Sequence, residues 1–280
     1  MSNKKAGNKK RRRIRALIAI IFAAVALFAG YKAVTILTEY KKGTDTYKDM
    51  EQYIHIEEPQ ETAEPSAEEI PQESEPEGIT EEEPEEEPVS QINWPKVDFE
   101  ALQQAYPDVV GWIYIEGTTV NYPIVQSTDN DYYLYRMPDG SYNSSGSIFM
   151  DCRNFTDFSD RNTVIYGHHM NNGSMFSDLL NYKNQEYFDE HSLCLVMTPE
   201  QNYTLEFFTG YVAATDENAW DVRFSTEEGF DEWLKYITGK AMFDTDLQVK
   251  STDRVVTLST CSYEFSDARF VMTGILKAEE

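Results

Sequence analysis

Two residues near the end of the chain combine a nucleophile with a cation. Cys261 closes a run rich in Val, Leu and Thr at residues 254–260, and Arg269 opens a second such run at residues 270–276. Both runs predict β-strands, joined by a polar connection at residues 262–267. The thiol and the guanidinium are thereby predicted at the same edge of two strands. Such a pair is typical of a cysteine-nucleophile site that still lacks its base.

The missing base is sought among four histidines, because proton transfer with a thiol needs a group that titrates near neutral pH. His168 and His169 follow a predicted strand at residues 163–166, which is the same kind of position as that of Cys261. The other two, His55 and His191, lie in polar segments. Residue types alone leave both His168 and His169 open, and a structural or solvent-facing histidine is the alternative.

Three cysteines, an odd number, mean that at least one thiol cannot pair within the chain. A disulfide between Cys152 and Cys194 is one option. Cys194 sits in the apolar run LCLVM, which favours a small buried hydrophobic residue instead. No Cys or His spacing is typical of a zinc site. We therefore expect no metal and no cofactor, and Cys261 is the thiol expected to be reachable.

The N-terminal part of the chain predicts a membrane anchor. The formal net charge is -25, yet residues 1–15 carry only Lys and Arg among the charged types. Residues 16–37 are apolar apart from Lys32, which approaches the roughly 20 residues that span a bilayer. The basic residues 1–15 are predicted to be cytoplasmic and the remainder extracellular. A cleaved secretory signal is the alternative, and it exports the same domain.

Residues 38–92 form a membrane-proximal segment and a linker. Residues 38–56 are mixed and polar with aromatic interruptions, and a helix that continues out of the membrane is one interpretation of them. Residues 57–87 are dominated by Glu, Pro, Ser and Gln. Like charge and proline keep such a segment extended, so we interpret it as a solvated stalk. A binding arm for a basic partner is the alternative. Much of the negative charge belongs to this segment, and no nucleic-acid partner is expected.

Residues 93–280 predict one folded domain that is mainly β with flanking helices. Helices are expected at residues 97–106 and 226–240, and a hairpin at residues 109–125. Further strands are expected at residues 147–150, 163–166, 193–197 and 203–212. The core candidates of the hairpin are Trp112, Ile113, Ile115, Val120, Ile124 and Val125. We interpret residues 129–140 as a surface turn, and the whole pattern as a β-barrel-like domain.

Three motifs give this domain a family resemblance. NTVIYGHHM at residues 162–170, TLSTC at residues 257–261 and Arg269 resemble the histidine, cysteine and arginine signatures of sortases. These are membrane-anchored transpeptidases of Gram-positive bacteria. Residues 111–136 are similar to the first hairpin and the following segment of class B sortases. The resemblance spans about residues 93–277 and implies an eight-stranded sortase-type β-barrel.

The resemblance also implies roles for individual residues. Cys261 matches the nucleophile, His168 the acid–base histidine, and Arg269 the arginine that binds the substrate backbone and stabilises the oxyanion. Tyr166 and Thr260 flank these residues and are candidates for positioning substrate, with strand packing as the alternative for each.

The implied partners are a sorting-signal peptide, cleaved after Thr, and an amine acceptor from a peptidoglycan precursor or a pilin. Two alternatives stay open. One is a cysteine endopeptidase that uses water as acceptor. The other is a catalytically silent surface adhesin or scaffold built on the same barrel.

Overall fold

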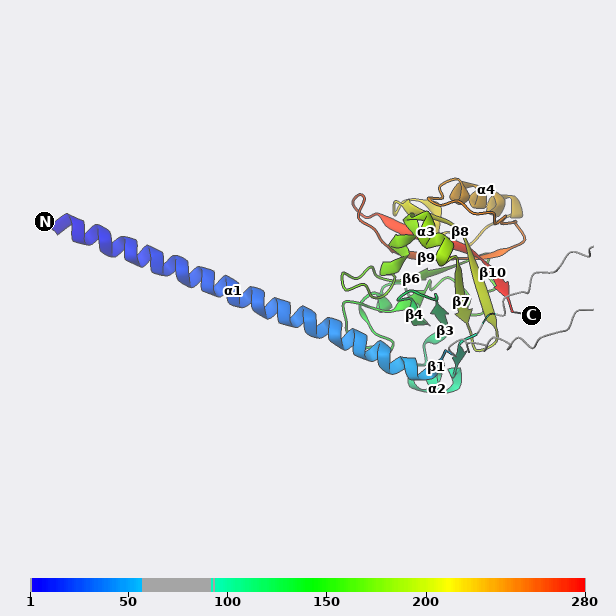
Figure 1. Cartoon of the computed structure of the whole chain (residues 1–280), viewed down its shortest axis with the longest axis horizontal. Helices are drawn as coiled ribbons and strands as arrows, with labels where there is room; N and C mark the ends of the chain where they lie inside the picture. Colours follow the sequence, from blue (N-terminus) through cyan, green and yellow to red (C-terminus); the bar gives the residue numbers. More distant parts are fainter. Residues whose placement is uncertain (1, 57–91, 93, 280) are drawn as a thin grey trace, which may run out of the picture.

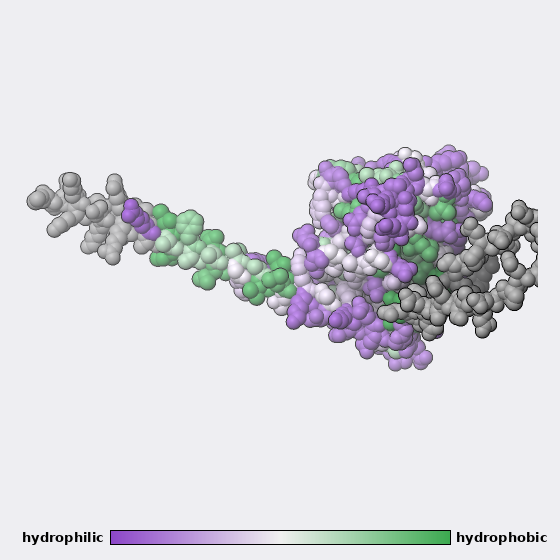
Figure 2. All heavy atoms as spheres, viewed as in Figure 1, coloured by the Kyte–Doolittle hydropathy of each residue, from purple (hydrophilic) through white to green (hydrophobic). Residues whose placement is uncertain are grey.

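A long N-terminal helix projects from a β-barrel domain. The computed structural model describes residues 2–56, 92 and 94–279, so most of the predicted stalk lies outside the described residues. Helix α1 runs without a break from Ser2 to Met50, and only its last turns meet the barrel (Figure 1). Its apolar part stands clear of the domain (Figure 2), and side chains such as Phe22 and Leu27 are exposed.

Among the described residues, one helix is long and apolar enough to cross a membrane, and it contains the predicted anchor. The exposed apolar surface of α1 is compatible with that prediction, because a bilayer would cover it.

The end of α1 belongs to the folded domain. Tyr47, Met50 and Ile54 are buried in the same core as the barrel. After the 3-10 turn η1 (Glu51–Tyr53), β1 (Ile54–His55) pairs with β2 (Lys96–Val97) in an antiparallel ladder. The sequence analysis began the domain at residue 93. The difference arises because Tyr47 and Met50 are three residues apart on one helical face, a short signal beside the longer apolar run of α1.

Eight strands close into a barrel in the order β10-β8-β7-β3-β4-β5-β6-β9. They are β3 (Val109–Tyr114), β4 (Asn121–Gln126), β5 (Ile148–Met150), β6 (Asn162–Tyr166), β7 (Leu193–Met197), β8 (Asn202–Ala213), β9 (Arg254–Cys261) and β10 (Arg269–Ala278). Two ladders, β4–β5 and β6–β9, are parallel, and the other six are antiparallel. The predicted barrel is confirmed, and closure leaves it no free edge.

Short helices cover the barrel. Asp98 caps α2 (Phe99–Ala105), and Thr226 caps α4 (Glu227–Thr238) by accepting a bond from the Gly229 amide. The remaining helical elements are η2 (Tyr132–Tyr135), η3 (Ser177–Lys183), α3 (Gln185–Glu190) and η4 (Asn218–Trp220). The sequence analysis predicted α2 and α4 from their apolar spacing. It did not predict α3, which has only six residues.

Alternation along β9 and β10 divides their side chains between two cores. Val256, Leu258, Phe270 and Met272 belong to the core that holds the barrel interior. Val255, Val271 and Ile275 belong to a second core on the outside, under Phe230, Trp233, Leu234 and Ile237 of α4. Each such fully buried side chain contributes on the order of 1.5–3 kcal/mol. Counting in steps of two from Val255 puts Ser259 and Cys261 on the outer face.

Candidate active site

Cys261 and Arg269 are direct partners across the β9–β10 ladder. The register pairs them as the last residue of β9 and the first of β10. Directly opposed residues in a sheet project from the same face, so the thiol and the guanidinium leave the outer face of the barrel together. Both residues are partly exposed. Arg269 Nη1 donates to the Ala268 carbonyl at 3.0 Å, and Cys261 is a free thiol.

His168 reaches the same edge on the neighbouring strand. Strand β6 runs parallel to β9 with Tyr166 beside Ser259, and the Gly167 amide donates to the Ser259 carbonyl at 3.0 Å. Parallel strands end at the same edge, and two further residues on each strand bring the chain to His168 and Cys261. Gly167 is needed here, because a Cβ would lie 2.5 Å from Ile148 Cδ1.

The His168 ring has a defined hydrogen bond. Its Nε2 lies 2.7 Å from the Leu134 carbonyl oxygen, and its ring centroid lies 5.6 Å from that of Tyr135. A carbonyl only accepts, so Nε2 carries a proton and donates. In the neutral imidazole the lone pair is then on Nδ1. This nitrogen is the one available to take up a proton.

His169 lies in different surroundings. Its Nδ1 is buried and has no hydrogen-bond partner among the described residues. Its ring lies 5.3 Å from that of Tyr263. Burial, and secondarily the charge of Lys183, lowers the pKa of His169 below its ordinary value of 6.5. One residue of offset therefore separates an imidazole whose Nε2 donates to a carbonyl from one whose pKa is lowered by burial.

Comparison with known proteins identifies the family. The model of the sortase domain matches residues 113–277, which is more than half of the chain. Sortase B of Listeria monocytogenes is 37% identical over 177 residues, which cover 62% of this chain and 72% of that protein. The chain belongs to class B of the sortase family. Sortases of this class are cysteine transpeptidases that anchor surface proteins.

Solved structures agree with this assignment. A Staphylococcus aureus sortase B–substrate complex has a TM-score of 0.63 and 32% identity, covering 65% of this chain and 85% of that chain. Sortase B from B. anthracis in complex with AAEK1 has a TM-score of 0.68 and 31% identity, covering 87% and 100% respectively.

Tyr166 and Thr260, the two candidates for substrate positioning, occupy different environments in this sortase. The Tyr166 hydroxyl donates to Asp151 Oδ2 at 2.8 Å. Thr260 is 2% exposed, and its buried hydroxyl has no partner among the described residues. Strand packing accounts for most of the Tyr166 side chain, which also contacts Phe149. Their roles in substrate binding stay predictions.

Asp151 organises a polar network behind the site. It is fully buried and accepts bonds from Tyr166 and from Arg153 Nε and Nη2 at 2.9 and 2.7 Å. Burial alone would raise the pKa of Asp151, but the hydrogen bonds from Arg153 and Tyr166 outweigh it and lower the pKa. Arg153 also donates to the Trp220 carbonyl, and the Trp220 indole donates to Ser259 Oγ at 3.0 Å. The network thus supports β9 two residues before Cys261.

The loop after Cys261 is bound to η3 by a hydrogen bond and an ion pair. Lys183 donates to Ser262 Oγ at 3.2 Å and forms an ion pair with Glu264. Hydrogen bonds from Lys183 and then Ser262 lower the pKa of Glu264 to about 2. The carboxylate is therefore charged at neutral pH, and it holds the loop that immediately follows the nucleophile.

The segment at residues 129–140 was interpreted as a surface turn, and that interpretation is wrong in part. Tyr133 and Met137 are buried in the main core, and the carbonyl of Leu134 receives the His168 hydrogen bond. The four-residue spacing of Tyr133 and Met137 was the signal that could have revealed the buried face.

The other cysteines of this sortase lie outside the site. All three thiols are free, so Cys152 and Cys194 form no disulfide. Cys194 is buried in β7, as the apolar run predicted, and burial raises its pKa. Within the described part of the chain, no group of three or more His, Cys, Asp or Glu side chains is arranged to hold a metal ion.

Proposed function

We propose that this sortase cleaves a sorting signal after a threonine and transfers the threonine carbonyl to an amine of the cell wall or of a pilin. One observation carries the proposal: Cys261 and Arg269 are paired on one face of β9–β10, at the edge where β6 leads to His168. The solved complex of the similar S. aureus sortase B with its substrate supports substrate binding by this sortase.

The first half of the reaction forms a thioester. The Cys261 thiol gives its proton to His168 Nδ1, and the resulting thiolate attacks the threonine carbonyl carbon. The C–N bond to the next residue then breaks, and the His168 imidazolium gives the Nδ1 proton to the departing amine. Arg269 faces the carbonyl oxygen while that oxygen carries negative charge, and such a preorganised cation contributes on the order of several kcal/mol.

The second half regenerates the enzyme. An acceptor amine attacks the thioester carbonyl and loses its proton to the neutral His168, and the Cys261 thiolate leaves. An amide bond has been exchanged for another amide bond, so the reaction needs no energy source. Splitting the exchange into two acyl transfers is the gain from covalent catalysis.

We also propose that α1 crosses the membrane once, with residues 1–15 in the cytoplasm and the barrel outside. The basic residues before the apolar segment support this orientation. Proteinase added to intact cells should then remove the barrel and spare an epitope at the N-terminus. Protection of the barrel in intact cells would contradict the orientation.

An acyl-transfer screen tests the reaction. Peptides that contain Thr-Gly, Thr-Asn or Thr-Ser are incubated with the full-length protein in detergent, with triglycine or a diaminopimelate-type amine as acceptor. Mass spectrometry of the products should show the peptide joined to the amine through threonine. A free threonine acid as the sole product, whatever the amine concentration, would indicate an endopeptidase. Neither product, together with a Cys261 thiol inert to a vinyl sulfone, would indicate a silent scaffold.

A further inference from the structure

The last turns of α1 form hydrogen bonds with a loop of the barrel domain. The side-chain amide of Asn143 donates to the Glu39 carbonyl at 3.0 Å, and the Tyr47 hydroxyl donates to the Gly146 carbonyl at 2.8 Å. Gly43 lets the helix approach closely, because a Cβ there would lie 3.3 Å from the side chains of both Asn143 and Ser145. The loop at residues 143–147 is therefore held by the helix that leads to the predicted membrane anchor.

The same loop supports the carbonyl that binds His168. The backbone amide of Ser147 donates to the Tyr133 carbonyl at 3.0 Å, and the backbone amide of Asn143 donates to the Tyr135 carbonyl at 3.1 Å. Gly146 has a φ of 58°, and a Cβ on it would lie 2.4 Å from the Leu134 carbonyl oxygen. That oxygen is the one 2.7 Å from His168 Nε2. A path of close neighbours thus runs from Tyr47 through Gly146 and the Leu134 carbonyl to the imidazole.

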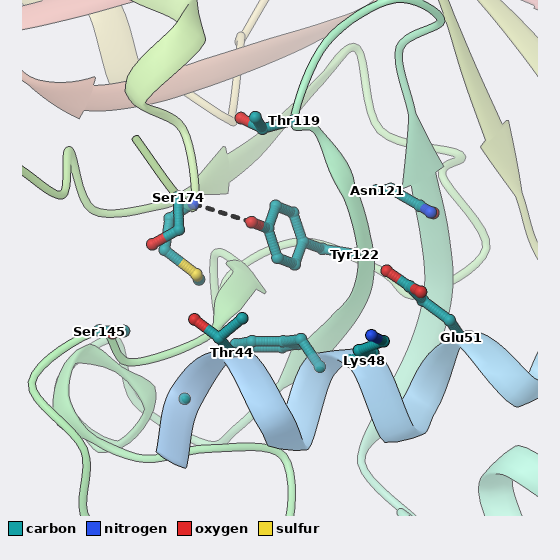
Figure 3. Close-up of a pocket in the computed structure, with 11 residues that line it drawn as sticks. Thr44, Lys48, Glu51, Thr119, Asn121, Tyr122, Ser145 and Ser174 are labelled. Atoms are coloured by element: carbon teal, nitrogen blue, oxygen red, sulfur yellow. Dashed lines mark hydrogen bonds between the residues drawn. The ribbon is translucent and has the colours of Figure 1, made fainter. Parts of the chain in front are cut away.

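A second path reaches the backbone of His168. The Tyr47 ring meets the Tyr122 ring edge to face, with centroids 5.0 Å apart. The Tyr122 hydroxyl accepts from the Met175 amide at 2.9 Å, the bond drawn in Figure 3. The next amide, that of Phe176, donates to the His168 carbonyl at 3.0 Å. One path from Tyr47 therefore ends at the imidazole ring of His168, and the other ends at its backbone carbonyl.

The contact between α1 and the barrel is not tightly filled. A cavity of about 230 Å³ lies beside Tyr47, lined by Thr44 and Lys48 of α1, by Glu51 of η1 and by residues of the barrel domain (Figure 3). The pocket leaves open space beside Tyr47, so the loss of its hydrogen bond gives the helix end room to shift.

We propose that Tyr47 is a positioning residue for His168, and that the docking of α1 thereby sets the rate of the transpeptidase. The proposal rests on the proposed role of His168 in proton transfer. Tyr47, with Gly43 beneath it, holds the 143–147 loop so that the Leu134 carbonyl keeps the proton on Nε2. Nδ1 is then left free to exchange protons with the reacting groups. Loss of docking slows the chemical steps and leaves peptide binding unchanged.

Two variants with matched controls test this in the full-length protein in detergent micelles. Tyr47→Phe removes only the hydroxyl that binds Gly146, and its control is Tyr53→Phe, whose ring contacts Tyr106 instead. Gly43→Leu forces the helix away from the loop, and its control is Gly30→Leu, where nothing lies within 4 Å of a Cβ. Both glycine variants gain the same helix propensity, so only docking differs between them.

Two readouts separate positioning from general stability. The first is the effect on kcat against KM for peptide transfer. The second is the ring ¹⁵N chemical shift of His168, assigned with His168→Gln, which reports the tautomer without any turnover. We expect kcat to fall roughly fivefold to tenfold in Tyr47→Phe, and further in Gly43→Leu, with KM unchanged. In both, the His168 signals should move from the Nε2–H tautomer toward a mixture, and the controls should match the wild type.

The outcomes are distinguishable from those of the proposed function. Wild-type kcat and unmoved His168 signals in both Tyr47→Phe and Gly43→Leu would overturn the positioning role, even if the protein is a transpeptidase. Transfer that persists in Cys261→Ala would instead overturn the proposed function and leave the tautomer measurement readable. If Gly43→Leu does not fold, Tyr47→Phe alone tests the positioning role, because this variant keeps the buried ring and removes only the hydroxyl that binds Gly146.

Discussion

Arg269 lies directly opposite Cys261 in the β9–β10 ladder, so the cation and the nucleophile share one face and one strand edge. Nothing but the hairpin register is needed to bring them together. The pairing makes Arg269 the cation nearest along the sheet to the proposed thioester.

Replacing Arg269 should therefore impair the reaction and spare the fold. We expect kcat/KM for transfer to fall by about 10²–10³ in Arg269→Ala, the range for loss of a preorganised oxyanion donor. Arg269→Lys should recover part of the activity, since it keeps the charge but not the planar fork. The matched control is Lys277→Ala at the far end of β10, where the side chain pairs with Glu206. Equal activity in Arg269→Ala and the control would remove Arg269 from the mechanism.

Replacing the two adjacent histidines should have different effects on catalysis. His168→Gln should lower kcat by about 10²–10⁴, the range for loss of a general acid–base. His169→Gln should stay within a few fold of the wild type, because His169 Nδ1 is enclosed away from hydrogen-bond partners in the described chain. Single-turnover assays with a fluorogenic sorting peptide measure both. The reverse order of the two effects would assign the chemistry to His169.

His169, whose Nδ1 is buried, should make stability fall as the solution becomes acidic. Its pKa is lowered in the folded state by burial, so below pH 6.5 the unfolded chain binds this proton more readily than the folded chain does. The contribution of His169 to the free energy of unfolding is complete above pH 6.5 and is lost as the pH falls. The fall in melting temperature between pH 7 and pH 5 should therefore be smaller in His169→Gln than in the wild type. Exposed His55→Gln is the control, and a slope identical to the wild type in His169→Gln would refute the assignment.

Asp151 should matter for stability through its buried partners. Asp151→Asn weakens the bonds from Arg153 and Tyr166 in a fully buried position, and we expect a loss of about 2 kcal/mol in the free energy of unfolding. That figure is below the range for a wholly buried pair, since the Arg153 side chain is 50% exposed. Urea unfolding measures the loss. Asp231→Asn, in the exposed i,i+4 pair with Lys235, should not move the midpoint, and equal effects would contradict the network.

The strands and their edge residues could be predicted from the sequence because their signals are local. Alternating apolar residues mark β9 and β10, and the short connection between them favours antiparallel neighbours. Cys261 and Arg269 were therefore predicted at the same strand edge. The helix α4 was equally visible from four apolar residues at helical spacing.

The distinction between His168 and His169 required the tertiary structure. It depends on the parallel pairing of β6 with β9, two strands far apart in the chain, and on the face that this register gives to each residue. The resemblance to sortases favoured His168, whereas the residue pattern alone left both open. The Leu134 carbonyl was beyond prediction, because a backbone oxygen has no sequence signature.

The docking of α1 on the barrel domain could not be predicted from the sequence either. Gly43 and Tyr47 lie between an apolar run and an acidic segment, and neither residue type signals a contact with a loop about a hundred residues later. Such a contact depends on the shape of two surfaces, and it carries no periodic pattern.

The most direct test of the account is the mass of the acyl-enzyme. The full-length protein is mixed with a sorting-signal peptide without any amine, quenched in acid, and digested for mass spectrometry. The account predicts a thioester that adds the peptide up to its threonine to Cys261, is removed by triglycine to give the transfer product, and is absent in Cys261→Ala. Transfer product formed at the wild-type rate in Cys261→Ala, or an adduct on a residue other than Cys261, would contradict it.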